Sequence, residues 1–167
     1  MQSALNIGRS LRLAAVLLAA LLCAGRCQAI DITATGAWSL LNDAGDLVFG
    51  AGSDLISDQE SAQDQVALTI ADTTGDTDNW RVDARRSDTN WPVGLSIFVK
   101  RTSDGAGTGN ISGGSAYQEV TVSDGSFFSG SGNRNGIGMQ LKLSGASVGI
   151  APDTYSTSIV YTVVDTS

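Results

Sequence analysis

The sequence contains no histidine, and its 167 residues include only two cysteines and two prolines. Without histidine the chain cannot form Ser-His-Asp or Cys-His catalytic centres, histidine-ligated zinc sites or a histidine pH switch. Cations are also scarce, with 10 Lys and Arg against 17 Asp and Glu. Because phosphate contacts need clustered Lys and Arg, this balance argues against nucleic acid and anionic lipid as partners. At roughly 100 to 200 residues per domain, the length fits one domain with one core.

Residues 1–29 have the order of features expected of a secretory signal peptide. Arg9 and Arg12 precede an apolar run from Leu13 to Ala24, and a small-residue pattern ends at Ala29. The run is about 12 residues long, short of the roughly 20 that a permanent transmembrane helix needs. We expect cleavage after Ala29, with lipid attachment or an uncleaved anchor as alternatives. The mature chain is then a single exported domain, residues 30–167, with no membrane span.

Removing this segment changes the composition of the mature chain. Both cysteines, Cys23 and Cys27, lie within it, as do three of the ten cations. Seven cations against 17 acids leave a net charge of −10. The domain would therefore reside in an oxidising compartment, extracellular, at the cell surface or in the periplasm, without a disulfide. Its stability must come from its core and its hydrogen bonds, which is feasible at this size.

Short apolar runs separated by Gly, Asp, Ser and Asn predict an all-β chain. The acids point the same way, since 15 are Asp, a turn residue, and only 2 are Glu. About seven strands favour an immunoglobulin-like two-sheet sandwich, with a jelly roll as the alternative. Residues 102–115 and 124–135, rich in Gly and Ser, are expected to be mobile hairpin tips. The expected strands are Ile30–Thr35 with Ala37–Leu41, Gln65–Ala71, Trp80–Arg86, Val93–Arg101, Tyr117–Ser123, Ile137–Gly145 and Tyr155–Val164.

The densest acidic cluster lies between two expected strands and contains Asp72, Asp76 and Asp78 around a glycine. Carboxylate oxygens arranged in this way can wrap calcium, which takes 6 to 8 oxygen ligands. The spacing lacks the late Glu of an EF-hand, and a solvated turn is the alternative reading. Calcium is the one cofactor that the sequence suggests. A second, looser acidic set precedes this cluster and consists of Asn42, Asp43, Asp46, Asp54 and Asp58.

The aromatic residues offer a second kind of candidate site. Trp38 and Trp80 sit within strand patterns, which favours burial over an exposed sugar-stacking platform. Phe127 and Phe128 lie in a Ser/Gly-rich segment, where two exposed aromatics are costly unless they fold onto the core or meet a partner. They are therefore a candidate binding tip, with capping of the core as the alternative.

Catalysis in this composition would depend on paired carboxylates, such as those that flank a glycosidic bond. Glu60 and Glu119 can be nominated, but nothing in the sequence singles out a pair. We therefore expect a protein that is not an enzyme.

The C-terminal sequence is the most distinctive part of the chain. Tyr155 follows Pro152 and opens a last strand, in the position of a tyrosine corner whose hydroxyl bonds to backbone. The ending Pro-x-x-Tyr-x-x-x-Ile-x-Tyr-Thr-Val, within residues 141–164, resembles the last strands of secreted bacterial pilin-like sandwiches, notably WxL cell-surface domains and the spore coat protein U group. The chain lacks the Trp-x-Leu motif, and it lacks the cysteines common in chaperone-assembled pilins, so the wall-binding residues of those families are not carried over.

This resemblance implies a structural or adhesive cell-surface protein, such as a fimbria-like or matrix subunit. Its partners would be copies of itself or other surface subunits, joined by strand addition. Ile30, Ile32 and Ala34 alternate with polar residues before Gly36, so they suit an assembly strand, with pairing inside their own domain as the alternative. Residues 30–35 and 155–164 are expected to be edge elements. The rival function is an extracellular calcium- or polysaccharide-binding module.

Overall fold

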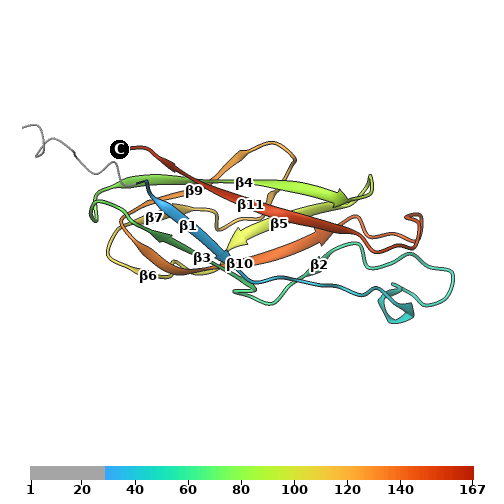
Figure 1. Ribbon diagram of the computed structural model, residues 1–167. Helices are drawn as coiled ribbons and strands as arrows, with labels where there is room; N and C mark the ends of the chain where they lie inside the picture. The colour runs from blue at the N-terminus through green and yellow to red at the C-terminus, as the bar shows by residue number, and fades with distance from the viewer. Residues whose placement is uncertain (1–28) are drawn as a thin grey trace, which may run out of the picture.

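The computed structural model describes residues 29–167, so the segment interpreted as a signal peptide lies outside the described residues except for Ala29. Two antiparallel sheets face each other in a β-sandwich (Figure 1). None of the helical segments in this part of the chain has the length and apolarity needed to cross a membrane. The all-β, two-sheet architecture predicted from the sequence is confirmed.

The seven-stranded sheet is built around one long strand, β10 (Arg134–Ser144). Its order is β1 (Asp31–Thr35), β3 (Val66–Ala71), β10, β5 (Ser96–Arg101) and β8 (Gln118–Glu119). Two short strands, β2 (Gln59–Glu60) and β6 (Ala106–Gly107), also pair with β10. The four-stranded sheet has the order β11 (Ser156–Asp165), β4 (Asn79–Asn90), β9 (Gly125–Ser131) and β7 (Ile111–Gly113).

The strands of five or more residues are β1, β3, β4, β5, β9, β10 and β11. In immunoglobulin constant domains the fifth strand is in the same sheet as the first, second and fourth strands. The sixth strand is in the other sheet, with the third and the seventh. Here β9 and β10 have exchanged sheets relative to that arrangement, because β10 lies beside β3 and β9 lies beside β4. The sandwich is therefore immunoglobulin-like in its layers and differs in strand order.

Alternation along the strands produces the core between the sheets. In β4 the side chains of Trp80, Val82 and Ala84 are buried, and the residues between them face outward. Trp80 packs edge-on against Phe128, with ring centroids 6.0 Å apart. A Cβ atom on Gly130 would come within 2.5 Å of the Trp80 ring, so only glycine fits there. The largest fully buried side chains are Trp80, Leu68, Ile70, Ile137, Met139, Val82 and Val99.

The prediction for residues 124–135 is wrong, because this segment forms β9 and the start of β10 rather than a mobile tip. Phe127 and Phe128 are 6% and 3% exposed, so the proposed binding tip is part of the core. The register between β4 and β9 shifts between Val82 and Asp83, and the partners of these two residues are Phe128 and Ser126. Phe127 is the extra residue of a bulge, which re-aims side chains, and both rings therefore point inward.

Four other expected segments also differ from the structure. Residues 37–41 form no strand, and residues 117–123 contain only the two-residue strand β8. The segment 102–115, expected as a mobile tip, contains β6 and β7, which pair with β10 and β9. Residues 93–95 form a turn before β5, and Val93 is fully exposed. The pairings within residues 102–115 and 117–123 are too short to leave a periodic pattern in the sequence.

Candidate functional site

The edge strand β11 is the longest strand with a neighbour on one side only. It pairs with β4 from Ser156 to Asp165 and ends the four-stranded sheet within residues 29–167. No charged residue, proline or glycine occurs from Ser156 to Val164. Natural edge strands are usually shortened, charged, bulged or covered, because free N–H and C=O groups recruit other strands. The pairing with β4 is irregular only at its start, where Thr89 of β4 is an extra residue between the partners of Ser156 and Thr157, so β11 offers a regular edge.

A hydrogen-bonded turn fixes where β11 begins. The hydroxyl of Tyr155 donates to the carbonyl oxygen of Ala151 at 2.6 Å, as the comparison with a tyrosine corner predicted. Asn90, at the end of β4, donates to the Thr154 carbonyl and holds the same turn from the other strand. The inward face of β11 then places Ile159, Tyr161 and Val163 against the core. The edge is therefore anchored at its start and along one face, and no strand within residues 29–167 pairs with its outer side.

The candidate assembly strand, β1, pairs with β3 of its own domain from Asp31 to Thr35. It ends the seven-stranded sheet in the described chain, so both expected edge elements are edges. Ile30 and Ile32 pack against the core, whereas Ala34 is exposed. Gly36 follows with a φ of +122°, and a Cβ atom there would lie 2.4 Å from the Gln65 carbonyl oxygen. In the structure β1 is therefore an ordinary first strand paired within its own domain, which was the alternative to an assembly strand.

The acidic cluster at residues 72–78 does not form the expected set of calcium ligands. No group of three or more acidic side chains within residues 29–167 is placed to hold a metal ion, which also applies to the looser acidic set before it. Asp78 is 8% exposed and accepts hydrogen bonds from the backbone and hydroxyl of Thr74 and from the hydroxyl of Ser167. Asp76 instead accepts from Thr108. Asp76 and Asp78 therefore bond to different donors, and the donors to Asp78 hold its pKa below the ordinary value. No hydrogen bond to the Asp72 carboxylate is formed within residues 29–167.

The two glutamates nominated for acid/base chemistry lie far apart. In the seven-stranded sheet Glu60 pairs with Lys142, Lys142 pairs with Phe98, and Phe98 pairs with Glu119. Three strand spacings of about 4.8 Å separate the two backbones by roughly 14 Å. Paired catalytic carboxylates need a separation of about 5 to 9.5 Å. The two carboxylates also bond to different partners, Glu119 to Ser96 and Glu60 to Gln140, so nothing in the described chain brings them together as a pair.

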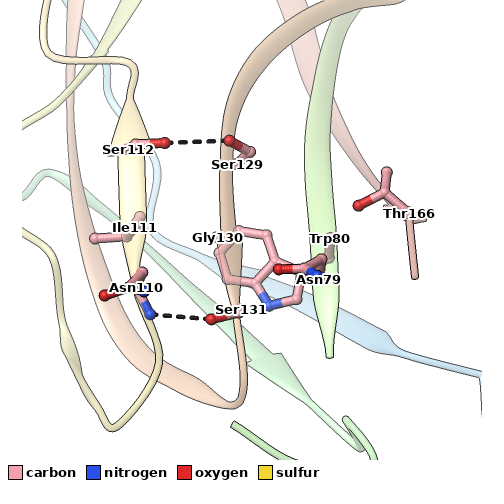
Figure 2. A pocket seen from close by; sticks show the side chains of 9 residues that line it. All are labelled: Asn79, Trp80, Asn110, Ile111, Ser112, Ser129, Gly130, Ser131 and Thr166. Carbon is pink, nitrogen blue, oxygen red and sulfur yellow. Dashed lines mark hydrogen bonds between the residues drawn. The ribbon is translucent and has the colours of Figure 1, made fainter. Parts of the chain in front are cut away.

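A shallow pocket of about 380 Å³ lies where β4, β9 and β7 run side by side (Figure 2). Its polar groups largely satisfy one another, with Ser112 bonded to Ser129 and the Asn110 N–H bonded to Ser131. The indole N–H of Trp80 donates to the Gly132 carbonyl at 2.9 Å. No charged side chain lines this pocket. It therefore offers neither an acid/base pair nor an ion site.

One end of the molecule exposes apolar side chains that the sequence reasoning missed. A small hairpin, closed by pairing of Leu47 with Leu55, carries Phe49 at 91% exposure. Asp54 binds the backbone N–H of Val148 and so joins this hairpin to the connection before β11 (Figure 1). Val148 is 62% exposed. The sequence signal for this exposure was the run Leu47-Val48-Phe49, whose apolar residues do not alternate with polar ones.

Comparisons of this chain with protein-family models, curated proteins and solved structures find no match.

Proposed function

We propose that this protein is an exported, non-catalytic structural or adhesive subunit that assembles at the cell surface by strand addition. The observation that carries the proposal is the edge of β11, a 10-residue strand that is uncharged up to Val164. Backbone pairing at such an edge supplies affinity, and the alternating side chains supply specificity. The order of features in residues 1–29 supports export.

The outward face of β11 suits this role. Ser156, Ser158 and Thr162 are exposed and small, so a strand added beside them meets no bulky or charged side chain. β1 lies close to β11 and ends the other sheet, which gives this side of the sandwich two edges. The partner is a strand of a second copy or of another surface subunit. The resemblance of residues 141–164 to pilin-like sandwiches implies the same kind of role.

A charge placed on the edge tests the proposal. Thr162 on β11 and Ser126 on β9 both lie opposite Asp83, one on each side of β4. Both are exposed, so Thr162→Lys and Ser126→Lys add the same charge near the same carboxylate. Thr162 is on the open edge strand, whereas β9 lies between β4 and β7 and the Ser126 carbonyl already accepts a hydrogen bond from Gln118. We expect the unsubstituted protein and Ser126→Lys to form oligomers or fibres as concentration rises, and Thr162→Lys to remain monomeric, because an edge lysine opposes strand addition.

Sizing chromatography with light scattering and electron microscopy of the purified protein provide the readout. A monomer at every concentration contradicts the proposal. Equal loss of assembly in both lysine variants also contradicts it, because the effect would then come from charge and not from the edge. Retained assembly in Thr162→Lys would exclude β11 as the pairing strand.

A further inference from the structure

Exposed apolar side chains gather at the end of the sandwich where β4 and β10 end (Figure 1). Of the eight large apolar side chains that are exposed within residues 29–167, seven come from residues 40–56, the turn 93–95 and the connection 145–155. We call this set the apolar tip, and its members are Leu40, Leu41, Val48, Phe49, Ile56, Val93 and Val148. Single exposed apolar residues are ordinary, whereas a group of them at one place indicates an interaction site.

Backbone contacts bring the three segments of the apolar tip together. The carboxylate of Asp54, in the small hairpin, accepts a hydrogen bond from the backbone N–H of Val148 at 2.8 Å. A Cβ atom on Gly145 would clash with the Gly94 carbonyl oxygen, so the turn 93–95 lies directly against the connection. The hairpin, the turn and the connection therefore form one surface.

Leu40 and Leu41 are tied to the same end through β2. The side-chain amide of Gln59, in β2, donates to the side-chain oxygen of Asn42 at 2.6 Å and to the Ile56 carbonyl at 3.2 Å. This amide links the residue that follows Leu41 to the end of the hairpin segment. The early chain thus adds its two leucines to the apolar tip.

The hairpin turn presents Phe49 to the outside. The backbone N–H of Phe49 donates to the Ser53 hydroxyl at 3.0 Å, and that hydroxyl donates to the Gly50 carbonyl at 2.7 Å. Gly50 and Gly52 have positive φ values, which permit the tight turn. The backbone is therefore held while the Phe49 ring stays 91% exposed. Burying such a ring against a partner is favourable.

The charge around the apolar tip has one sign. No Lys or Arg occurs in residues 36–58, 87–95 or 145–155. Of the six acids in these segments, Asp58 and Asp88 pair with Lys142 and Arg86. The acids that take part in no ion pair within residues 29–167 are Asp43, Asp46, Asp54 and Asp153. The Val148 N–H lowers the pKa of Asp54, so this carboxylate at the apolar tip is ionised at neutral pH.

We propose that the apolar tip binds a segment of another protein in which apolar side chains occur among lysines or arginines. The apolar contacts supply affinity, and charge complementarity with the surrounding aspartates selects a cationic partner. The same aspartates oppose an anionic lipid surface and the tip of a second copy, since both are negative. This proposal does not depend on strand addition at β11.

Titration of the purified protein into a short fluorescent peptide of leucine and lysine tests the proposal by fluorescence anisotropy. Two companion peptides replace every lysine with glutamate or every leucine with serine. We expect saturable binding of the leucine–lysine peptide only. Absence of saturable binding overturns the proposal. Equal binding of the glutamate peptide contradicts charge complementarity, and equal binding of the serine peptide contradicts the apolar contact.

Substitutions locate the binding site. Phe49→Ser should weaken peptide binding about tenfold or more, and Val148→Ser about threefold, because each removes apolar area. Val122→Ser is the matched control, since Val122 is 60% exposed and Val148 is 62% exposed. Val122 lies beside β4, where the neighbouring Thr121 carbonyl accepts from the Arg86 N–H, and should bind the peptide normally. Equal weakening in Val148→Ser and Val122→Ser overturns a site at the apolar tip.

Other occupants of the apolar tip give different results. Binding to phosphatidylcholine vesicles that is lost in Phe49→Ser would assign the apolar tip to a membrane and overturn the proposal. Self-association that is lost in Phe49→Ser would assign it to a second copy, with the same consequence. Thr162→Lys should keep peptide binding, because it alters only the β11 edge. Loss of peptide binding in Thr162→Lys would place the peptide on that edge and overturn the proposal.

Discussion

The two sides of the sandwich end in different kinds of strand. On one side the sheets end on β1 and β11, which have 5 and 10 residues and lie close together. At the other ends of the sheets, β8 has 2 residues and β7 has 3. Short edges present few free backbone groups, so they resist unwanted pairing. Under the proposed function, β11 is therefore the edge at which a strand is added, and the short edges β7 and β8 are not.

The largest effect should come from breaking the core that supports both sides. Trp80→Ala removes a fully buried ring that contacts Phe128 and covers Gly130. We expect the free energy of unfolding to fall by about 3–5 kcal/mol, the usual cost of such a truncation. Chemical denaturation measures it. If hydrogen exchange shows that Trp80→Ala loses protection in β11 but keeps it in β3, the two sheets do not depend on one common core.

Gly36→Ala should affect the β1 side alone. Alanine at a φ of +122°, with its Cβ atom 2.4 Å from the Gln65 carbonyl oxygen, is strained by about 1–3 kcal/mol. We expect faster hydrogen exchange in β1 and unchanged exchange in β11. Gly50→Ala is the matched control, since Gly50 also has a positive φ, +83°, but nothing within 4 Å of the added atom. An equal effect of the two substitutions would rule out the contact with Gln65 as the cause.

Tyr155→Phe should weaken the turn at the start of β11 by about 1 kcal/mol, the net contribution of one hydrogen bond. The bond lost is the one to the Ala151 carbonyl. Tyr161→Phe is the control, because the Tyr161 hydroxyl is buried without a partner in the described chain and burial raises its pKa. We expect that control to be neutral or stabilising in urea denaturation. A larger loss of unfolding free energy in Tyr161→Phe than in Tyr155→Phe would contradict a stabilising role for the Tyr155 hydrogen bond.

The smallest effect concerns the far end of β11, where Ser167 donates to Asp78. The pKa of Asp78 is lowered mainly by the Thr74 N–H and then by Ser167, against the effect of burial. Its stabilisation is therefore fully present above the unfolded-state pKa of about 3.9 and is lost as the pH falls through the lower folded-state pKa. We expect Asp78→Asn to reduce the fall in melting temperature over that acid range. An unchanged acid profile would contradict this, and Asp124→Asn, at an exposed site, serves as the control.

Long alternating runs were the predictable part of the fold. The runs that became β3, β4, β5, β10 and β11 each bury one face, so their periodicity records the core directly. The edge positions of β1 and β11 and the hydrogen bond of Tyr155 also followed from sequence patterns. The candidate sites followed less well, because Asp76 and Asp78 are close in sequence but bond to different distant residues, Thr108 and Ser167.

The sparse composition by itself limits the chemistry of this protein, since few catalytic centres are possible without histidine and with both cysteines confined to residues 1–29. Hydrophobic alternation likewise specified strands and a two-sheet sandwich. Tertiary structure alone decided the fate of the Gly- and Ser-rich segments. A bulge turned Phe127 and Phe128 inward, and Gly107 left space for Arg134. The positions of these side chains depend on which strand is paired with their own, and the paired strands come from distant parts of the chain.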